Sequence, residues 1–311
     1  MAVIGGVNGS GKTTLLNFIA KALHLLVEHP DSIPEVLLAD EAFIDFKISG
    51  GEREIDPGEV RFLLGNKKFF EQHQTAHCFG YQLTGGRPKR IAEGRAASLQ
   101  RLLSNRTAFA ASSLPSLLYI PSEFRTLQIP YEEFKSPGKM PAPSEFVYQW
   151  MPAQTWNQSL EARLYSARWE DLNAKEEGRP EEARHFEAYA NAFQIFTGRS
   201  KALVWKSGEL AIELKDDRNE RTRHSLWELS SGEKEVLILA SELLLRWRRG
   251  SLVMIDEPEL HLHPAWQLRL WQVLLDFRRE RGGQIIIATQ SPHLFGAAEI
   301  GTKLLMGSAQ L

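Results

Sequence analysis

The chain has 311 residues, and its 37 Lys and Arg residues against 39 Asp and Glu residues give a formal net charge of −2. Hydrophobic residues make up 43% and charged residues 24% of the chain, which excludes disordered and collagen-like proteins. A single cysteine, Cys78, excludes an intrachain disulfide and a thiolate zinc cluster. No apolar run approaches the ~18 residues that span a bilayer, so we expect a cytoplasmic protein of about two domains with no membrane partner.

The first part of the chain mixes strand and helix patterns. An apolar strand candidate at residues 2–4 is followed directly by a glycine-rich turn and a helix with a broad apolar face. The other elements predicted in this part are strands at 36–39, 43–48 and 116–120 and a helix at 91–103.

The second part is more regular. After a proline-rich connector at 136–152, two amphipathic segments at 158–174 and 180–196 predict an α-hairpin. Strands and helices then follow one another in the order strand 202–206, strand 209–214, helix 232–247, strand 252–255, helix 264–279 and strand 284–288. The alternation of helix and strand at the end of the chain predicts a parallel sheet with covering helices.

Residues 6–13, with the sequence Gly-Val-Asn-Gly-Ser-Gly-Lys-Thr, fit the pattern of a phosphate-binding loop between a strand and a helix. Glycines let successive backbone N–H groups point inward around phosphate oxygens. Lys12 supplies a positive charge for the β- and γ-phosphates, and the Thr13 hydroxyl is placed to bind Mg²⁺. The alternative, a glycine-rich turn with a surface lysine, is disfavoured by the flanking strand and helix. The predicted ATP-binding residues of this loop are Asn8, Gly9, Ser10, Gly11, Lys12, Thr13 and Thr14.

Two carboxylates follow the apolar strand at 252–255. The carboxyl ends of parallel strands are where ligands of α/β folds bind, so both acids are expected in the site. Asp256 is predicted to hold Mg²⁺, and Glu257 is predicted to accept a proton from the attacking water. The alternative is an acidic turn that caps the helix beginning at Pro264.

Leu229-Ser230-Ser231-Gly232-Glu233 stands immediately before a predicted helix. Serines and a glycine at a helix start present N–H groups and hydroxyls to an anion, which predicts Ser230, Ser231 and Gly232 as ATP contacts. The alternative for the same residues is an ordinary capping box, a serine with an acid three residues later.

The order and spacing of the three motifs resemble the head of the ABC-type ATPases. Within that superfamily, the sequence Asp-Glu-Pro-Glu-Leu-His-Leu-His-Pro at 256–264 and Ala-Thr-Gln-Ser-Pro at 288–292 are similar to the branch of the OLD and RecF-like ATPases. That branch includes the antiviral-defence ATPases of Septu and retron systems. Gln290 stands where the superfamily has a switch histidine, with His293 three residues further on, and either could contact the γ-phosphate.

The resemblance implies an α/β fold of the P-loop NTPase type, with a mainly parallel sheet and covering helices, an antiparallel β lobe and a short helical insertion. It divides the chain into an N-terminal part of the head at 1–135, a helical insertion at 136–200 and a C-terminal part at 201–311. It also implies a homodimer that sandwiches two ATP molecules. Each ATP would lie between the Lys12 loop of one subunit and residues 230–232 of the other.

The function implied by the resemblance is hydrolysis of ATP to ADP and phosphate, with ATP-dependent dimerisation acting as a switch. The expected partner is a separate effector protein, a nuclease or another toxin, with DNA or RNA as further candidates, in antiviral defence or DNA repair. Two alternatives remain. One is an ATPase subunit coupled to a transporter, which the missing Ser-Ala-Leu-Asp loop disfavours, and the other is a non-hydrolysing ATP-binding scaffold, which Gln290 suggests.

Three further groups of residues draw attention. His261 and His263 are more typical of a shaped turn than of a metal site, because no cysteine or third clustered histidine completes a ligand set. Arg246, Arg248 and Arg249 suit the end of a helix better than a nucleic-acid contact. The basic segment at 87–90 is the better candidate for facing DNA.

Overall fold

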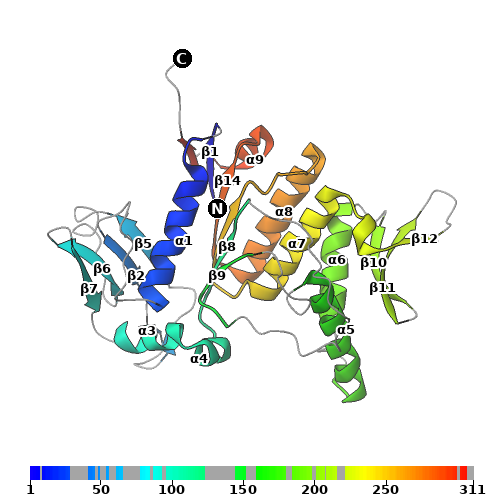
Figure 1. Cartoon of the computed structure of the whole chain (residues 1–311), viewed down its shortest axis with the longest axis horizontal. Helices are drawn as coiled ribbons and strands as arrows, with labels where there is room; N and C mark the ends of the chain where they lie inside the picture. The colour runs from blue at the N-terminus through cyan, green and yellow to red at the C-terminus, as the bar shows by residue number, and fades with distance from the viewer. Residues whose placement is uncertain are drawn as a thin grey trace.

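A six-stranded parallel sheet forms the centre of the molecule (Figure 1). The computed structural model describes residues 1–7, 9–28, 41–45, 48–49, 54–55, 61–65, 78–84, 87–92, 96–122, 144–151, 159–179, 184–197, 201–206, 208–215, 221–299 and 302–306. The strands lie in the order β15-β1-β14-β13-β8-β9. Their bounds are β1 (Ala2–Gly6), β8 (Leu117–Ile120), β9 (Val147–Gln149), β13 (Leu252–Asp256), β14 (Gln284–Thr289) and β15 (Lys303–Met306).

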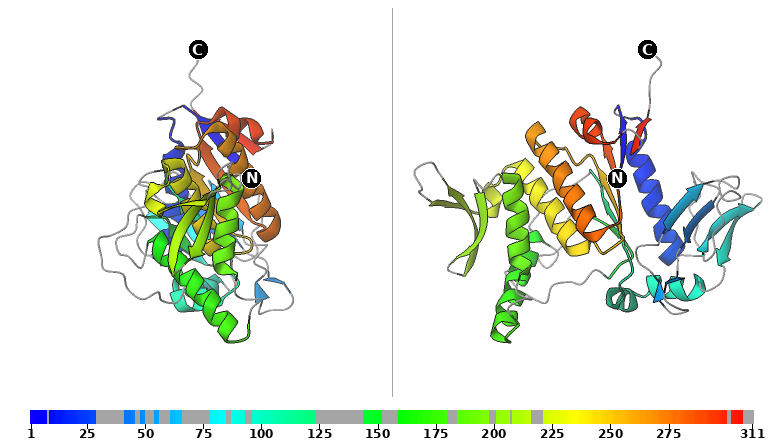
Figure 2. Two further views of the ribbon diagram at one scale, coloured as in Figure 1. Left: turned by 90° about the vertical axis from the view of Figure 1, so that its right-hand side faces the viewer. Right: turned by 180° about the vertical axis from the view of Figure 1, so that it is seen from behind.

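Helices cover both faces of this sheet (Figures 1 and 2). Along β13, Leu252 and Met254 join one hydrophobic cluster, and Val253 and Ile255 join the other, because successive side chains of a strand point to opposite faces. The first face is covered by α1 (Lys12–Glu28), α3 (Ala96–Ser104) and α4 (Arg106–Ala111). The second face is covered by α5 (Leu160–Glu176), α6 (His185–Thr197), α7 (Ser231–Arg246) and α8 (Pro264–Arg281).

Antiparallel strands lie at the two ends of the long axis (Figure 1). Beyond α1 is a four-stranded sheet in the order β5-β2-β6-β7, made of β2 (Glu41–Asp45), β5 (Arg61–Gly65), β6 (Cys78–Thr84) and β7 (Arg87–Ala92). A two-stranded pair joins β3 (Ile48–Ser49) to β4 (Glu54–Ile55). At the other end is a three-stranded sheet of β10 (Lys201–Lys206), β11 (Glu209–Lys215) and β12 (Arg221–His224).

The predicted α-hairpin is confirmed as α5 and α6, which pack on each other. Side-chain oxygens cap the N-termini of both helices. The Ser159 hydroxyl accepts a hydrogen bond from the backbone N–H of Ala162. The buried Asp171 carboxylate, within α5, accepts from the backbone N–H groups of His185 (2.8 Å) and Phe186 (3.0 Å) at the start of α6. A charged oxygen on otherwise unsatisfied N–H groups fixes where the second helix begins.

The arginines near the end of α7 have structural contacts. Arg246 forms an ion pair with Glu242 at 2.8 Å, and its guanidinium lies over the Tyr148 ring. Arg248 donates to carbonyl oxygens at the end of α4, including those of Phe109 (2.9 Å) and Ala110 (3.1 Å). The contacts of Arg248 satisfy carbonyl oxygens at the end of a helix, and those of Arg246 are an ion pair and a ring contact, which supports the structural interpretation of both arginines.

Two predicted elements are wrong in part. The helix predicted at 91–103 begins only at α3, because Ile91 and Ala92 belong to β7 and pair with Gly80 and Phe79 of β6. The connector predicted at 136–152 contains β9, which pairs in parallel with β8. In both places pairing with another strand decides the local conformation.

Some of the other elements have the bounds predicted from the sequence to within a few residues. Others were not predicted. The strands and helices expected at the end of the chain correspond to α7, β13, α8 and β14. The strand expected at 36–39 lies outside the described residues. Sequence patterns did not indicate several other elements, which include β4, β5, β6, α4, β12, α9 (Pro292–Ala297) and β15. Among the described helices, none has the length and apolar character that crossing a membrane requires.

Candidate nucleotide-binding site

The glycine-rich loop joins β1 to α1 at the carboxyl edge of the central sheet. Gly9 and Gly11 have left-handed backbone angles, φ 76° and 89°, which favour glycine. Lys12 is only 4% exposed, and its Nζ donates to the carbonyl oxygens of Gly6 (2.9 Å) and Val7 (3.0 Å). The ammonium group therefore lies inside the curve of the loop, where phosphate oxygens are expected. Ser10 is half-buried beside it, Thr14 is exposed in the first turn of α1, and Asn8 lies outside the described residues.

Thr13 and Asp256 meet although 243 positions separate them. The Thr13 hydroxyl donates to Asp256 Oδ2 at 2.7 Å, and the Ser122 hydroxyl donates to the same oxygen at 3.0 Å. Asp256 is fully buried, and its Oδ1 has no hydrogen-bond partner among the described residues. A buried carboxylate oxygen without a partner is costly, and hydroxyl and carboxylate oxygens are the ligands that Mg²⁺ prefers. This donor set therefore fits a Mg²⁺ ion.

Glu257 and Gln290 also contact each other. Glu257 follows β13 with φ 46°, which is rare for a residue with a side chain, and its backbone N–H donates to the carbonyl oxygen of Ala288 at 2.7 Å. The Gln290 side-chain amide donates to Glu257 Oε1. His293 lies on α9, where its backbone N–H donates to the Ser291 hydroxyl. Of the two candidates for the switch position, Gln290 is the one whose side chain contacts the predicted base.

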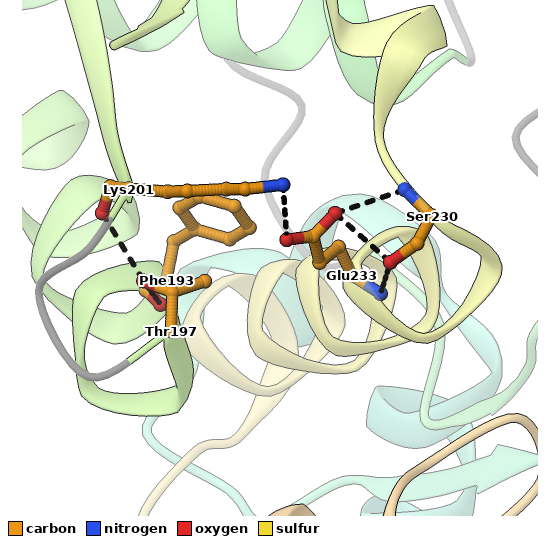
Figure 3. A network of polar contacts seen from close by, with 5 residues as sticks. All are labelled: Phe193, Thr197, Lys201, Ser230 and Glu233. Carbon is orange, nitrogen blue, oxygen red and sulfur yellow. Dashed lines mark hydrogen bonds and ion pairs between the residues drawn. The ribbon is translucent and has the colours of Figure 1, made fainter. Parts of the chain in front are cut away.

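The start of α7 forms the capping box that the sequence offered as an alternative (Figure 3). The backbone N–H and the hydroxyl of Ser230 both donate to Glu233 Oε2 at 2.9 Å, and Lys201 pairs with Glu233 Oε1 at 2.6 Å. Burial by itself raises the pKa of Glu233, but the hydrogen bonds from Lys201 and Ser230 outweigh it and hold the pKa below its usual value. Ser230 and Ser231 nevertheless remain exposed residues at a helix N-terminus, although the Ser230 hydroxyl is engaged with Glu233.

Gly232 brings α7 against the loop that follows β13. A Cβ at this position would lie 2.6 Å from the carbonyl oxygen of His261. His261 is exposed with φ 62°, and His263 caps α8 by accepting from the backbone N–H of Ala265. Both histidines therefore shape the turn between β13 and α8, and no group of three metal-ligating side chains was found in the described part of the chain.

The predicted residues fall into two groups. Lys12, Thr13, Asp256, Glu257 and Gln290 lie together at the carboxyl ends of β1, β13 and β14. Ser230, Ser231 and Gly232 begin α7, which covers the face opposite α1 (Figure 2).

Two residues at this site were not found from the sequence. Ser122 comes just after β8, and Asp256 is the last residue of the neighbouring β13, so the adjacency of these parallel strands was the available signal. Glu259 accepts hydrogen bonds from three donors of the 289–291 segment; it belongs to the motif at 256–264, but the sequence assigned it no role.

Comparisons with known proteins agree with this geometry. Protein ea59 of Escherichia phage lambda is 35% identical over 98 residues, which is 30% of this chain and 19% of that protein. Septu protein PtuA of Bacillus thuringiensis is 39% identical over 56 residues, 18% of this chain and 14% of that protein. The chain thus matches less than a fifth of the length of either relative.

A solved structure shares the fold of the whole chain. The crystal structure of the SmcHead bound to the C-winged helix domain of ScpA aligns with a TM-score of 0.50 at 18% identity, covering 95% of this chain and 83% of that one. The fold is therefore that of an Smc head domain. The sequence family described as "AAA domain, putative AbiEii toxin, Type IV TA system" matches residues 1–296. The chain belongs to this family of P-loop ATPase domains.

Proposed function

We propose that the protein binds ATP with Mg²⁺ and hydrolyses it to ADP and phosphate. The observation that carries the proposal is the contact between Thr13 and Asp256, which joins the phosphate-binding loop to the acidic end of β13 at 2.7 Å. A nucleotide–Mg²⁺ complex requires a loop that binds phosphate and, beside it, a carboxylate oxygen that can bind the metal. Glu257 is the next residue along the chain, so a proton acceptor adjoins the same site.

Each residue has a separate task in this proposal. Lys12 and the loop N–H groups bind the β- and γ-phosphates, and Thr13 and Asp256 hold Mg²⁺. The metal, when bound, neutralises charge on the phosphates. Glu257 accepts a proton from the water that attacks the γ-phosphorus, while the bond to the β–γ bridging oxygen breaks. Gln290, hydrogen-bonded to Glu257 Oε1, orients this base.

The second part of the proposal is that ATP closes two heads into a dimer. Ser230 and Ser231 are exposed at the N-terminus of α7, on the side of the sheet away from α1, so they suit the ATP of a second subunit. The positive end of the α7 dipole would face its γ-phosphate. ATP shifts the equilibrium only if it binds the closed state more tightly than the open one. We further propose that closure signals to a separate effector, in keeping with the local similarity to the Septu protein.

The test combines two variants of the site. Lys12→Ala removes the cation from the loop and should abolish ATP binding in calorimetry and phosphate release. Glu257→Gln should retain ATP binding, lose phosphate release by at least about a hundredfold, and accumulate an ATP-dependent dimer in light scattering. Unchanged affinity in the first variant would contradict the loop assignment. A second variant that binds ATP but stays monomeric would contradict the sandwich.

A further inference from the structure

The carboxylate of Glu259 joins two segments that leave neighbouring strands. Its Oε1 accepts hydrogen bonds from the Thr289 hydroxyl at 2.7 Å, the Gln290 backbone N–H at 2.7 Å and the Ser291 backbone N–H at 3.1 Å. We call residues 257–263, which follow β13, the acid loop, and residues 289–291, at the end of β14, the switch segment. Three donors converge on one charged oxygen, and such charge-assisted hydrogen bonds are the stronger class.

A second connection holds the same two segments. The Ser291 hydroxyl donates to Gln267 Oε1 at 2.5 Å, and Gln267 Nε2 donates to the carbonyl oxygen of Leu262 at 3.0 Å. All three residues are buried. The switch segment is therefore tied to the acid loop at both Glu259 and Leu262, which fixes the backbone at position 290 from two sides.

This fixed backbone determines where the Gln290 side chain points. The side-chain amide donates to Glu257 Oε1, and Glu257 itself has the strained angle φ 46°. Glu259 is thus connected to Glu257 through Gln290. Glu259 is poorly suited to be a base itself, because its Oε1 already accepts three hydrogen bonds and its Oε2 is buried.

We propose that Glu259 is a positioning residue that sets the orientation of Glu257 by holding Gln290. The proposal rests on the proposed ATP hydrolysis, because it assigns Glu259 a part in that reaction. Glu259→Ala should lower kcat for ATP about tenfold while changing KM less than about threefold, because the phosphate-binding loop is untouched. Glu259→Gln keeps a carbonyl acceptor but places an amide group where Oε2 is buried without a partner, so it should restore only part of kcat.

The decisive kinetic comparison is a double-mutant cycle with Gln290→Ala. If Glu259 works through the Gln290 side chain, Glu259→Ala should lower kcat in the wild-type background and have no further effect when Gln290 is already alanine. An equal loss of kcat in both backgrounds would overturn the proposal, because it would mean that Glu259 acts independently of Gln290. A change confined to KM would overturn it as well.

A second readout does not depend on activity. Hydrogen exchange at the backbone amide of Gln290 should become at least about tenfold faster in Glu259→Ala, because this amide loses its acceptor. The Ser291 amide should change less, because it also donates to the Thr289 hydroxyl at 2.9 Å. The matched control is Glu280→Ala, which removes an exposed glutamate at the end of α8 and should leave both amides unchanged. Unchanged exchange in Glu259→Ala would overturn the proposal.

The two proposals can fail separately. If ATP turnover survives Lys12→Ala, the proposed function fails, and the exchange measurement still decides whether Glu259 holds the switch segment. If Lys12→Ala abolishes turnover while Glu259→Ala keeps the wild-type kcat, only the positioning role fails.

Discussion

At the scale of single residues, Gly232 shows how closely the start of α7 approaches the acid loop. A Cβ at Gly232 would lie 2.6 Å from the carbonyl oxygen of His261, closer than real Cβ contacts allow. Gly232→Ala should therefore lower the free energy of unfolding by about 1–3 kcal/mol, the usual cost of overpacking. Denaturant unfolding with a linear extrapolation measures the change.

The control for this prediction is a glycine in another helix. Gly296 lies within α9, and a Cβ there would have no neighbour within 4 Å. Gly296→Ala should be neutral or stabilise the protein by about 0.4–1 kcal/mol, because alanine loses less backbone entropy on folding. If both variants had the same effect, the close approach to His261 would not be the cause.

At the scale of secondary-structure elements, the capping box of α7 makes the stability of the folded protein depend on pH. The pKa of Glu233 is lowered in the folded protein, so its stabilising effect is present above the usual value of 4.5 and is lost as the pH falls through the folded value. Thermal unfolding of the wild type should therefore show Tm falling below about pH 4.5. Glu233→Gln should lower Tm at pH 7 and make Tm less dependent on pH in this range.

A second capping box provides the comparison for this prediction. Glu228 accepts from the backbone N–H and the hydroxyl of Ser225, and these hydrogen bonds also lower its pKa, but the carboxylate is exposed and its ion-pair partner is His224 at 3.7 Å. Solvent screens such a group, so Glu228→Gln should change Tm less than Glu233→Gln at pH 7. An equal effect of the two variants would show that burial and Lys201 contribute nothing.

The elements also show what the sequence could and could not predict. The ends of β1 and β13 were predictable, because a buried parallel strand is a continuous apolar run and the chemistry follows it directly. Helix α3 was placed too early because cross-strand pairing of β7 with β6 is invisible to local periodicity. Glu259 was missed for a related reason, since its partners lie 30 to 32 positions away in a different loop.

At the scale of the whole molecule, the predicted ATP contacts are divided between the carboxyl edge of the central sheet and the start of a helix on the face opposite α1. Lys12 and Asp256 lie at the carboxyl edge with α1, whereas Ser230 begins α7 on the other face (Figures 1 and 2). A γ-phosphate carries more negative charge than one loop neutralises, and the N–H groups at the start of α7 offer further partial positive charge. We therefore expect these groups to act on the ATP of a partner subunit.

Heterodimers of two variants test this arrangement. Lys12→Ala disables the loop, and Ser230→Arg blocks closure sterically while leaving ATP binding by the monomer close to normal. In a heterodimer of the two, a shared-site arrangement puts both defects in one site and leaves the other site intact. The mixture should recover up to about half of the wild-type phosphate release, while each variant alone is inactive. Two affinity tags isolate the heterodimer, and circular dichroism checks that Ser230→Arg folds.

The matched control reverses the arrangement of the same two substitutions. A double variant, Lys12→Ala with Ser230→Arg, is paired with a wild-type subunit. If the sites are shared, each site of this heterodimer contains one defect, so phosphate release should be lost. If each subunit used its own Ser230, the wild-type subunit would remain active and the single-variant mixture would stay inactive. The two arrangements therefore predict opposite outcomes for heterodimers of identical composition, because only the distribution of the two substitutions between the subunits differs.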